Sequence, residues 1–392
     1  MTTTPSLSGL IVADFSRVLA GPFVTMTLGD LGADVIKVER PEGDDTRAWG
    51  PPFAADESTY YLGLNRNKRS IVLDLHDSAD RDVAARLVRH ADVLVENFRP
   101  GVMDRFGLDE QTVRTDNPAL VYCSISAFGS EAGRNLAGYD LLVQALGGLM
   151  SITGRDATHP TKVGVAMVDV LAGLFATIGI LAALRERDRS GAGQRVEVNL
   201  LSTLLSALAN QSASYVLADV VPTAMGNGHP SIAPYDTFQT GDGTLVLAVG
   251  TDHQFRLLCD AIAGPELSID PRFLTNELRV RHRHRLRHLI ECRLANRGAA
   301  EWTSILTTVG VPAGSVNNIK EAFALAEQLG LRPIAQTRDD PGIRGRQVAS
   351  PLTLSETPVV YGRRAPSLGE HTQDIRALLD LSSDSAARDC RG

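Results

Sequence analysis

The sequence has few of the features that mark secreted, metal-binding or nucleic-acid-binding proteins. Its four cysteines in 392 residues are scattered and form no CxxC pair, which excludes a zinc ribbon and predicts reduced thiols. No basic N-terminal stretch precedes an apolar one, so we expect no secretory signal and a cytoplasmic location. Acidic residues (46) outnumber basic residues (39), which argues against a nucleic-acid or anionic-membrane surface.

Long apolar runs and cofactor fingerprints are also missing. The longest apolar run covers residues 170–184, shorter than the about 20 residues that a membrane span needs, so we expect a buried helix there. No GxGxxG turn follows the first predicted strand, and no GxxxxGK[ST] motif occurs. The sequence therefore gives no support for NAD or ATP, and any polyanionic ligand must be bound by a local cluster of arginines.

The first half of the chain alternates strand-like and helical patterns. Strands separated by helices indicate a parallel sheet with helices on both faces. We therefore predict an α/β fold with a Rossmann-like large domain. The predicted strands are residues 10–15, 34–39, 71–75, 93–96, 120–124 and 194–199, and the predicted helices are residues 22–31, 80–90, 102–106, 140–149, 165–187 and 200–218.

The length of the chain exceeds the usual size of one domain, and its composition changes after residue 220. Residues 221–234 are rich in glycine, proline and small polar residues, which is typical of a linker and mobile loop. A hairpin pattern at 235–250, followed by helical segments, predicts a smaller α+β domain. The predicted boundaries are 1–220 and about 335–380 for the large domain, 221–334 for the small domain, and 382–392 for a disordered tail.

A series of short motifs runs through nearly the whole chain in a characteristic order. They are Leu7-Ser8-Gly9-Leu10, Ala20-Gly21-Pro22, the run from Leu31 to Glu39, Asn67-Lys68-Arg69-Ser70, the run from Glu96 to Gly101, Gly138-Tyr139-Asp140 and Gly147-Gly148. Together they resemble the class III coenzyme A transferases, the family of formyl-CoA and carnitine-CoA transferases, which has the α-methylacyl-CoA racemases as relatives. The resemblance implies an interlocked homodimer, acyl-CoA and carboxylic acid substrates, and no metal or redox cofactor.

Asp169 is the candidate catalytic residue. It stands near the start of a predicted helix, followed by an apolar run. Taken alone, an aspartate in a first turn more often caps its helix. A carboxylate beside an apolar wall also suits covalent catalysis, because partial desolvation makes it a better nucleophile. The family resemblance places its nucleophilic aspartate here, and this favours the catalytic interpretation.

The CoA site is predicted from arginines and from the resemblance. Arg17, Arg40, Lys68, Arg69, Arg99 and Arg105 fall at or just after predicted strand ends, where ligands bind in open α/β sheets. The resemblance gives CoA-contacting or lining roles to matching positions. These are Arg17, Val18, Arg40, Leu73, Leu75, His76, Asn97, Phe98, Arg99, Arg105, Ala137, Gly138, Tyr139 and Asp140.

Two positions depart from the formyl-CoA enzymes. Ala137 stands where those enzymes have a lysine, which removes one expected CoA contact. Leu19 stands where they have a glutamine, which argues against formate or oxalate as the substrate. The sequence does not name the acids that this protein uses.

A glycine loop at residues 225–230 matches in position the loop that covers the active site in the family. Gly226, Asn227 and Gly228 are therefore candidate active-site loop residues, since glycines let a backbone approach a ligand and move. A plain domain linker would have a similar composition. His229 is either a substrate contact or a residue that stabilises the loop.

A run of arginines and histidines occupies residues 281–288. His284 and His288 share one face of a helix and have the spacing of a metal pair. No Cys, Asp or Glu nearby completes a metal site, and the arginines repel a cation. We therefore predict a solvated basic helix face and no metal.

Three functions fit the sequence. An acyl-CoA:carboxylate CoA-transferase would work through an aspartyl mixed anhydride and an aspartyl-CoA thioester. An α-methylacyl-CoA racemase needs an acid and a base beside the α-carbon, and racemases have a histidine where this chain has Tyr139, which favours transfer. A non-catalytic CoA-binding protein is a third possibility, which the retained Asp169 disfavours.

Overall fold

The computed structural model describes residues 4–389 and divides into two compact units. Unit 1 contains the chain up to Leu149, Val163–Asp219, and the chain from Arg332 onward. Unit 2 contains Met150–Lys162 and Val220–Leu331. The segment 150–162 was expected in the large domain and belongs instead to unit 2. It does so because it is bonded to the glycine loop, with the Gly226 N–H donating to the Gly154 carbonyl at 3.0 Å.

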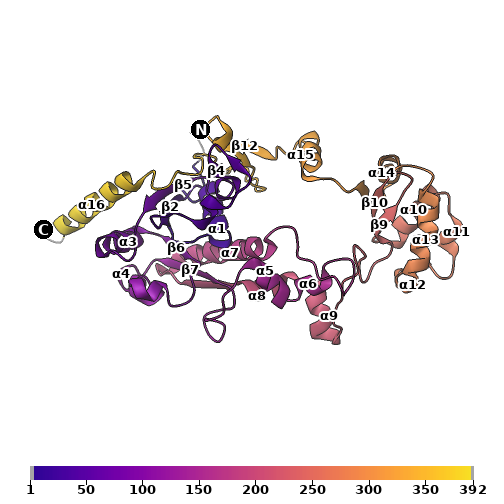
Figure 1. The fold of residues 1–392 in the computed structure, drawn as a ribbon, viewed down its shortest axis with the longest axis horizontal. Coiled ribbons are helices and arrows are strands. Elements are labelled where there is room, and N and C mark those ends of the chain that lie inside the picture. The colour runs from indigo at the N-terminus through magenta and orange to yellow at the C-terminus, as the bar shows by residue number, and fades with distance from the viewer. Residues whose placement is uncertain (1–3, 390–392) are drawn as a thin grey trace. The chain divides into compact units, whose positions relative to one another are not determined.

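Unit 1 is built on a six-stranded parallel sheet in the order β5-β2-β1-β6-β7-β8 (Figure 1). Numbered in chain order, the six strands lie in the order 3-2-1-4-5-6 across the sheet. This is the doubly wound order of Rossmann-like folds, the class predicted for this domain. The order reverses between β1 and β6, so a ligand crevice is expected outside the carboxyl ends of these two strands. The strands are β1 (Ile11–Asp14), β2 (Asp34–Glu39), β5 (Lys68–Val72), β6 (Val93–Glu96), β7 (Val121–Ser126) and β8 (Arg195–Asn199).

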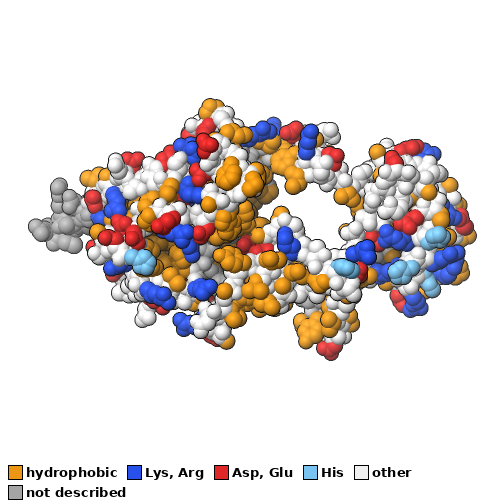
Figure 2. Space-filling model, in the orientation of Figure 1, with side chains coloured by type: hydrophobic (Ala, Val, Ile, Leu, Met, Phe, Trp, Pro, Cys, Tyr) orange, Lys and Arg blue, Asp and Glu red, His pale blue; other side chains and the backbone are white. Residues whose placement is uncertain are grey.

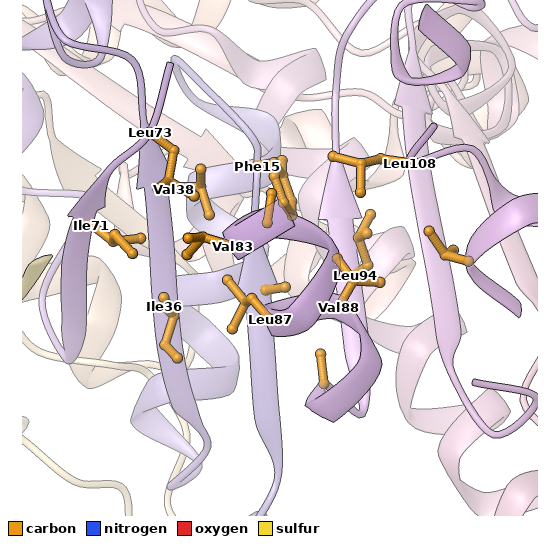
Figure 3. Packing of buried hydrophobic residues seen from close by; sticks show 14 of the residues in the cluster. Phe15, Ile36, Val38, Ile71, Leu73, Val83, Leu87, Val88, Leu94 and Leu108 are labelled. Carbon is orange, nitrogen blue, oxygen red and sulfur yellow. The ribbon is translucent and has the colours of Figure 1, made fainter. Parts of the chain in front are cut away.

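Side chains that alternate along the strands feed a hydrophobic core on each face of the sheet. One face carries Val12, Val35 and Val93 and is covered by α1 (Ala20–Asp30) and α7 (Met167–Ser190). The other face carries Phe15, Ile36 and Leu94. It is covered by α3 (Ser78–His90), α4 (Glu110–Asp116) and the start of α16 (Thr372–Asp389). Figure 3 shows Val83, Leu87 and Val88 of α3 in this core.

Helix α7 is the crossover between the parallel strands β7 and β8. A crossover helix runs opposite to the strands that it joins, so the first turn of α7 lies at the carboxyl edge of the sheet. Among the described helices it is the one long and apolar enough to span a membrane, by length and composition only. Its residues Ala172, Ala176, Ile180 and Ala183 are buried in the core of unit 1, as in the predicted core helix.

Strand β5 differs from the prediction. It covers Lys68–Val72 rather than residues 71–75. The apolar pattern did not reveal it because Lys68 and Ser70 are polar yet fully buried, each with an acidic partner inside the fold. The predicted helix 200–218 is also divided, into α8 (Leu200–Ala207) and α9 (Asn210–Ala218), at Ala209 with its φ of 45°.

The C-terminal part of the chain returns to unit 1. The Val360 N–H donates to the Asp30 carbonyl at 2.7 Å, and the His371 N–H donates to the Ser70 carbonyl at 3.0 Å. The expected disordered tail, 382–392, overlaps α16, which continues as a helix to Asp389; residues 390–392 lie outside the described part of the chain. The remaining elements of unit 1 include η1 (Asp45–Ala48), β3 (Phe53–Ala54), β4 (Glu57–Ser58), α2 (Thr59–Leu62), η2 (Met103–Phe106), α5 (Asp140–Leu146), β12 (Ile334–Gln336), η3 (Ile343–Gly345) and β13 (Arg346–Val348).

Unit 2 is an α+β structure with its own core. An antiparallel hairpin pairs with a third short strand, and helices pack on it around Phe238, Leu247, Leu258 and Ile290. The strands are β9 (Tyr235–Gln239), β10 (Thr244–Ala248) and β11 (Ala313–Ser315). The helices are α10 (Asp252–Ala261), α11 (Glu266–Ile269), α12 (Asn276–Arg281), α13 (Arg283–Leu294), α14 (Ala299–Thr308) and α15 (Ile319–Gln328), while α6 (Leu149–Ile152) begins in unit 1.

Candidate active site

The loops that follow β1 and β6 are joined at the point where the strand order reverses. The Arg17 N–H donates to Asn97 Oδ1 at 2.8 Å, and Asn97 Nδ2 donates to the Arg17 carbonyl at 2.7 Å. The Arg17 guanidinium lies over the Phe98 ring, 4.9 Å from its centroid. Paired amide contacts of this kind fix the two loops relative to each other.

Two neighbouring pockets open beside these loops. The first has a volume of about 270 Å³ and contains Asp169 in its wall. The second has a volume of about 580 Å³. Arg17, Phe98 and Arg99 line both pockets. Of the other residues predicted from sequence, the first is lined by Val18, Asn97, Ala137, Gly138 and Tyr139, and the second by Arg40, Leu73, Leu75 and His76.

Several predicted cations do not line either pocket. Arg105 is exposed on η2, away from both linings, although Val102 and Phe106 beside it line the second pocket. Lys68 and Arg69 lie at the amino end of β5, opposite to the edge that was expected. Lys68 is fully buried with its Nζ 3.0 Å from the Asp14 carboxylate, and Arg69 pairs with Asp34. Both residues thus have acidic partners within unit 1 and line neither pocket.

The Asp169 carboxyl group is half-buried in the first turn of α7. Among the described residues, none donates a hydrogen bond to the Asp169 carboxylate. The backbone N–H of Asp169 donates to Asp140 Oδ1 at 3.2 Å. Burial and the nearby negative charge of Asp140 together raise the pKa of Asp169 to about 7. A carboxylate that faces a pocket without a partner is available to react.

Asp140 takes the capping role that was the alternative explanation for Asp169. It is the first residue of α5 and is buried. Its Oδ1 accepts the N–H groups of Val168 at 2.8 Å and Asp169 at 3.2 Å, which are free donors at the start of α7. Its Oδ2 accepts a hydrogen bond from Gln144. Asp140 therefore lies behind Asp169 and outside both pocket linings, which corrects its predicted role as a CoA contact.

The loop after β1 depends on two buried residues that the sequence analysis missed. Val18 has a φ of 69°, which is strained for a β-branched residue. Its N–H points to the Asp44 carboxylate at 3.3 Å, and Lys37 bridges Asp44 at 2.9 Å and the Ser16 carbonyl at 3.0 Å. Burial alone would raise the pKa of Asp44, but Lys37 and Thr46 hold it at about 2. A lysine between the apolar residues Ile36 and Val38 of strand β2 was the available signal.

Tyr60 is another residue that sequence reasoning missed. It lies on α2, where its ring meets Trp49 edge to face at 5.5 Å. Burial and the negative charges of Asp169, Asp140 and Asp44 raise the pKa of Tyr60 to about 12. The Tyr60 hydroxyl is therefore close enough to these three carboxylates to be affected by their charge, and it remains a neutral phenol at neutral pH.

The predicted loop residues Gly226, Asn227 and Gly228 belong to unit 2. Gly226 has a φ of 64°, which favours glycine. The Gly228 N–H donates to the Met225 carbonyl at 3.2 Å, and Asn227 Nδ2 donates to Thr237 Oγ1 at 3.2 Å. These bonds form a tight turn whose base is tied to β9.

Comparison with known proteins identifies the family. A model of CoA-transferase family III matches residues 7–372. The chain belongs to this family. It is 43% identical to the succinate–glutarate CoA-transferase of Agrobacterium fabrum, over 97% of this chain and 98% of that protein. It is 38% identical to the succinyl-CoA:glutarate CoA-transferase of Homo sapiens, over 96% of this chain and 86% of that protein.

A solved structure supports the same assignment. The fold matches the crystal structure of a CAIB/BAIF family protein from Brucella suis with a TM-score of 0.85 and 40% identity, over 96% of this chain and 100% of that chain. The protein is thus a class III CoA-transferase with the mixed α/β fold of that family. Its proposed substrate is a CoA thioester, and among residues 4–389 no group of three or more His, Cys, Asp or Glu side chains has metal-binding geometry.

The basic run at residues 281–288 of this CoA-transferase is solvated in part, as predicted, because Arg281, His284, Arg285 and His288 are exposed. The half-buried Arg283 and Arg287 depart from the prediction, since both are hydrogen-bonded within unit 2. Arg283 Nη1 donates to the His229 carbonyl at 2.9 Å and Nη2 to the Pro230 carbonyl at 2.7 Å. Arg287 donates to Asp236 at 2.6 Å and to the Thr237 carbonyl. Figure 2 shows Arg and His side chains gathered on the face of unit 2 that carries these helices. Arg283 holds the end of the glycine loop and Arg287 holds strand β9, roles that their spacing alone does not reveal.

Proposed function

We propose that the protein transfers CoA between carboxylic acids with Asp169 as the nucleophile. The observation that carries this proposal is the Asp169 carboxylate itself. It lies in a pocket at the reversal point of the sheet, it has no hydrogen-bond donor among the described residues, and Asp140 already caps the helix. Membership in CoA-transferase family III supports the same reaction.

The reaction balances without a cofactor. Asp169 attacks the thioester carbonyl of the donor, which forms a mixed anhydride and releases CoA thiolate. The thiolate attacks the aspartyl carbonyl, which forms an aspartyl-CoA thioester and releases the donor acid. The acceptor carboxylate then attacks the aspartyl thioester, and the released thiolate takes the acceptor acyl group, so Asp169 is regenerated. Each tetrahedral oxyanion needs preorganised hydrogen-bond donors, which are usually backbone N–H groups.

The two pockets fit the two ends of CoA. The larger pocket has Arg40 and His76 in its lining and suits the phosphate-bearing end, because arginine forks bind phosphate oxygens. The smaller pocket holds Asp169 and suits the thioester end. Arg17 and Arg99 line both pockets and would bind the part of CoA between these two ends.

Dicarboxylic acids are the proposed substrates. The two relatives described above are named for succinate or succinyl-CoA and for glutarate, which are four- and five-carbon dicarboxylic acids or their CoA thioesters. We also propose a cytoplasmic homodimer, as the resemblance implies. Exposed apolar side chains on α9, including Tyr215, Val216 and Leu217, offer a surface for such a contact. A solution molar mass of a single 42.0 kDa chain would contradict it.

Asp169→Asn tests the nucleophile. The change keeps the size of the side chain and removes the charged oxygen, so we expect transfer to be abolished while acyl-CoA still binds. Asp188→Asn, at the exposed end of the same helix, is the matched control and should keep normal turnover. Hydroxylamine added to the wild type with acyl-CoA should leave a hydroxamate on Asp169, detected by mass spectrometry. Near-normal turnover of Asp169→Asn, with deamidation excluded by mass, would refute the proposal.

The pH dependence tests the carboxylate pair. Asp169 attacks only when ionised, so kcat/KM of the wild type should rise with pH through about 7. Asp140→Asn removes the neighbouring negative charge and therefore lowers the pKa of Asp169. We expect the acidic limb of the profile to move to lower pH in this variant. A lower rate at every pH with an unmoved limb would mean that Asp140 acts only through the helix cap.

A further inference from the structure

The pocket that holds Asp169 has an unequal balance of charge. Its charged lining residues are three arginines, Arg17, Arg99 and Arg134, and two acidic residues, Asp45 and Asp169. All five belong to unit 1. An aspartyl thioester is uncharged, so the positive excess grows when Asp169 becomes part of the covalent intermediate of the proposed reaction. The pocket then favours an anionic ligand beside that intermediate.

The three arginines differ in what they already bind. The Arg17 guanidinium is 3.6 Å from the Asp45 carboxylate and lies over the Phe98 ring. Within the part of the chain that the structure describes, the side chains of Arg99 and Arg134 have no hydrogen-bond or ion-pair partner. The charges of Arg99 and Arg134 are therefore available to a ligand.

Arg134 is the one of these three arginines that does not line the pocket proposed for the CoA phosphates. Arg17 and Arg99 line that larger pocket as well as the pocket of Asp169. Arg134 instead also lines a third pocket of about 300 Å³. The third pocket is a poor site for an anion, because its lining contains five acidic residues and three arginines. The charge of Arg134 is thus best used inside the pocket that holds Asp169.

The loop that carries Arg134 follows strand β7 at the carboxyl edge of the sheet. The Arg134 N–H donates to the Glu131 carbonyl at 3.1 Å. A Cβ atom added at Gly101 would lie 3.3 Å from Arg134 Nη2, so the guanidinium lies close to the backbone of the loop after β6. The exposed Asp104 lies near the same point and forms no ion pair with Arg134. The Arg134 side chain therefore reaches from one loop to the other along the wall of the pocket.

We propose that Arg134 binds the carboxylate of the acid that exchanges with CoA. The inference rests on the proposed function. The donor acid leaves the pocket as a carboxylate, and the acceptor acid arrives as a carboxylate to attack the aspartyl carbonyl, so both halves of the reaction place an acid anion beside Asp169. An enclosed carboxylate is costly without a cation, and the guanidinium fork matches it in geometry and charge. The fork can hold one carboxylate oxygen while the other attacks.

Arg134→Ala tests the assignment by separating the acid from CoA. With the acceptor acid that the wild type uses best, we expect the KM of the acid to rise at least about ten-fold, as for the loss of one charged hydrogen bond. The Kd of CoA, measured by calorimetry, should stay unchanged, because Arg134 does not line the pocket proposed for the phosphates. Arg134→Lys keeps the charge and should restore part of the affinity for the acid. Arg89→Ala, on an exposed residue of α3 outside the three pockets, is the matched control and should behave as the wild type.

Hydroxylamine trapping separates this inference from the reaction itself. Acyl-CoA should still acylate Asp169 in Arg134→Ala, so a hydroxamate should form as in the wild type. If the wild type forms the hydroxamate and the KM of the acid is unchanged in Arg134→Ala, this inference alone fails. A weaker affinity for CoA in Arg134→Ala would also overturn it, because Arg134 would then act on CoA. If the wild type forms no hydroxamate, the proposed function fails first and this inference fails with it.

Discussion

Two loops carry candidate site residues, one in each unit, and they are held in different ways. In unit 1, the Ser16–Val18 loop is fixed by Asp14, Lys37 and Asp44, which are 0%, 0% and 3% exposed. In unit 2, the half-exposed Arg283 of α13 holds the end of the glycine loop, and the half-exposed Arg287 holds strand β9 beside it. The first loop is thus held by fully buried charged side chains, and the second by half-exposed arginines.

The difference implies different mechanical roles. Buried ion pairs with complete hydrogen bonding are strongly destabilising to break, so they can hold a strained residue such as Val18 in one conformation. Hydrogen bonds from half-exposed guanidinium groups to carbonyls contribute less to stability and can be replaced by hydrogen bonds to water. The first loop is therefore preorganised for a ligand, while the second can open and close at small cost.

Lys37→Met gives the largest effect that this comparison predicts. It leaves the Asp44 carboxylate buried without its cation, so we expect the free energy of unfolding to fall by about 3–5 kcal/mol. Urea unfolding followed by circular dichroism measures it. The double variant Lys37→Met/Asp44→Leu removes both charges and should recover part of the loss. If Lys37→Met is as stable as the wild type, the first loop is not held from the interior in the way described.

The sequence predicted the sheet well because its strands follow simple patterns. Strands β2 and β6 have the predicted bounds, since Val35, Ile36 and Val38 in β2 and Val93–Val95 in β6 give both strands a strong apolar pattern. Strand β5 was misplaced because Lys68 and Ser70 are buried through partners at Asp14 and Glu39, which are distant in sequence. A local pattern cannot show that a charge will be neutralised by a residue from another strand.

The candidate site shows the same difference between what a local pattern predicts and what depends on residues distant in sequence. Arg17, Asn97 and Asp169 were predicted from motifs and from the resemblance, and the structure brings all three to one pocket. The capping of α7 by Asp140 was missed, because it joins residues 28 positions apart. The contacts of Arg283 were missed for the same reason, since its partner His229 is 54 positions away. Residue types indicated the chemistry, while the supporting contacts depend on the three-dimensional fold.

Arg283→Ala gives the smallest effect on stability and tests how the glycine loop of unit 2 is held. The change removes two bonds to the carbonyls of His229 and Pro230. Because the side chain is half-exposed, we expect the free energy of unfolding to fall by only about 1 kcal/mol.

The informative readout for Arg283→Ala is local. Hydrogen exchange should accelerate at the Gly226, Gly228 and His229 amides, which are bonded within the loop and its base, while the Ser16–Val18 loop stays protected. Arg285→Ala, an exposed residue on the same helix, is the matched control and should leave both loops as in the wild type. Unchanged exchange at those three amides would show that the arginines of α13 do not hold the loop, and the contrast between the two loops would then be lost.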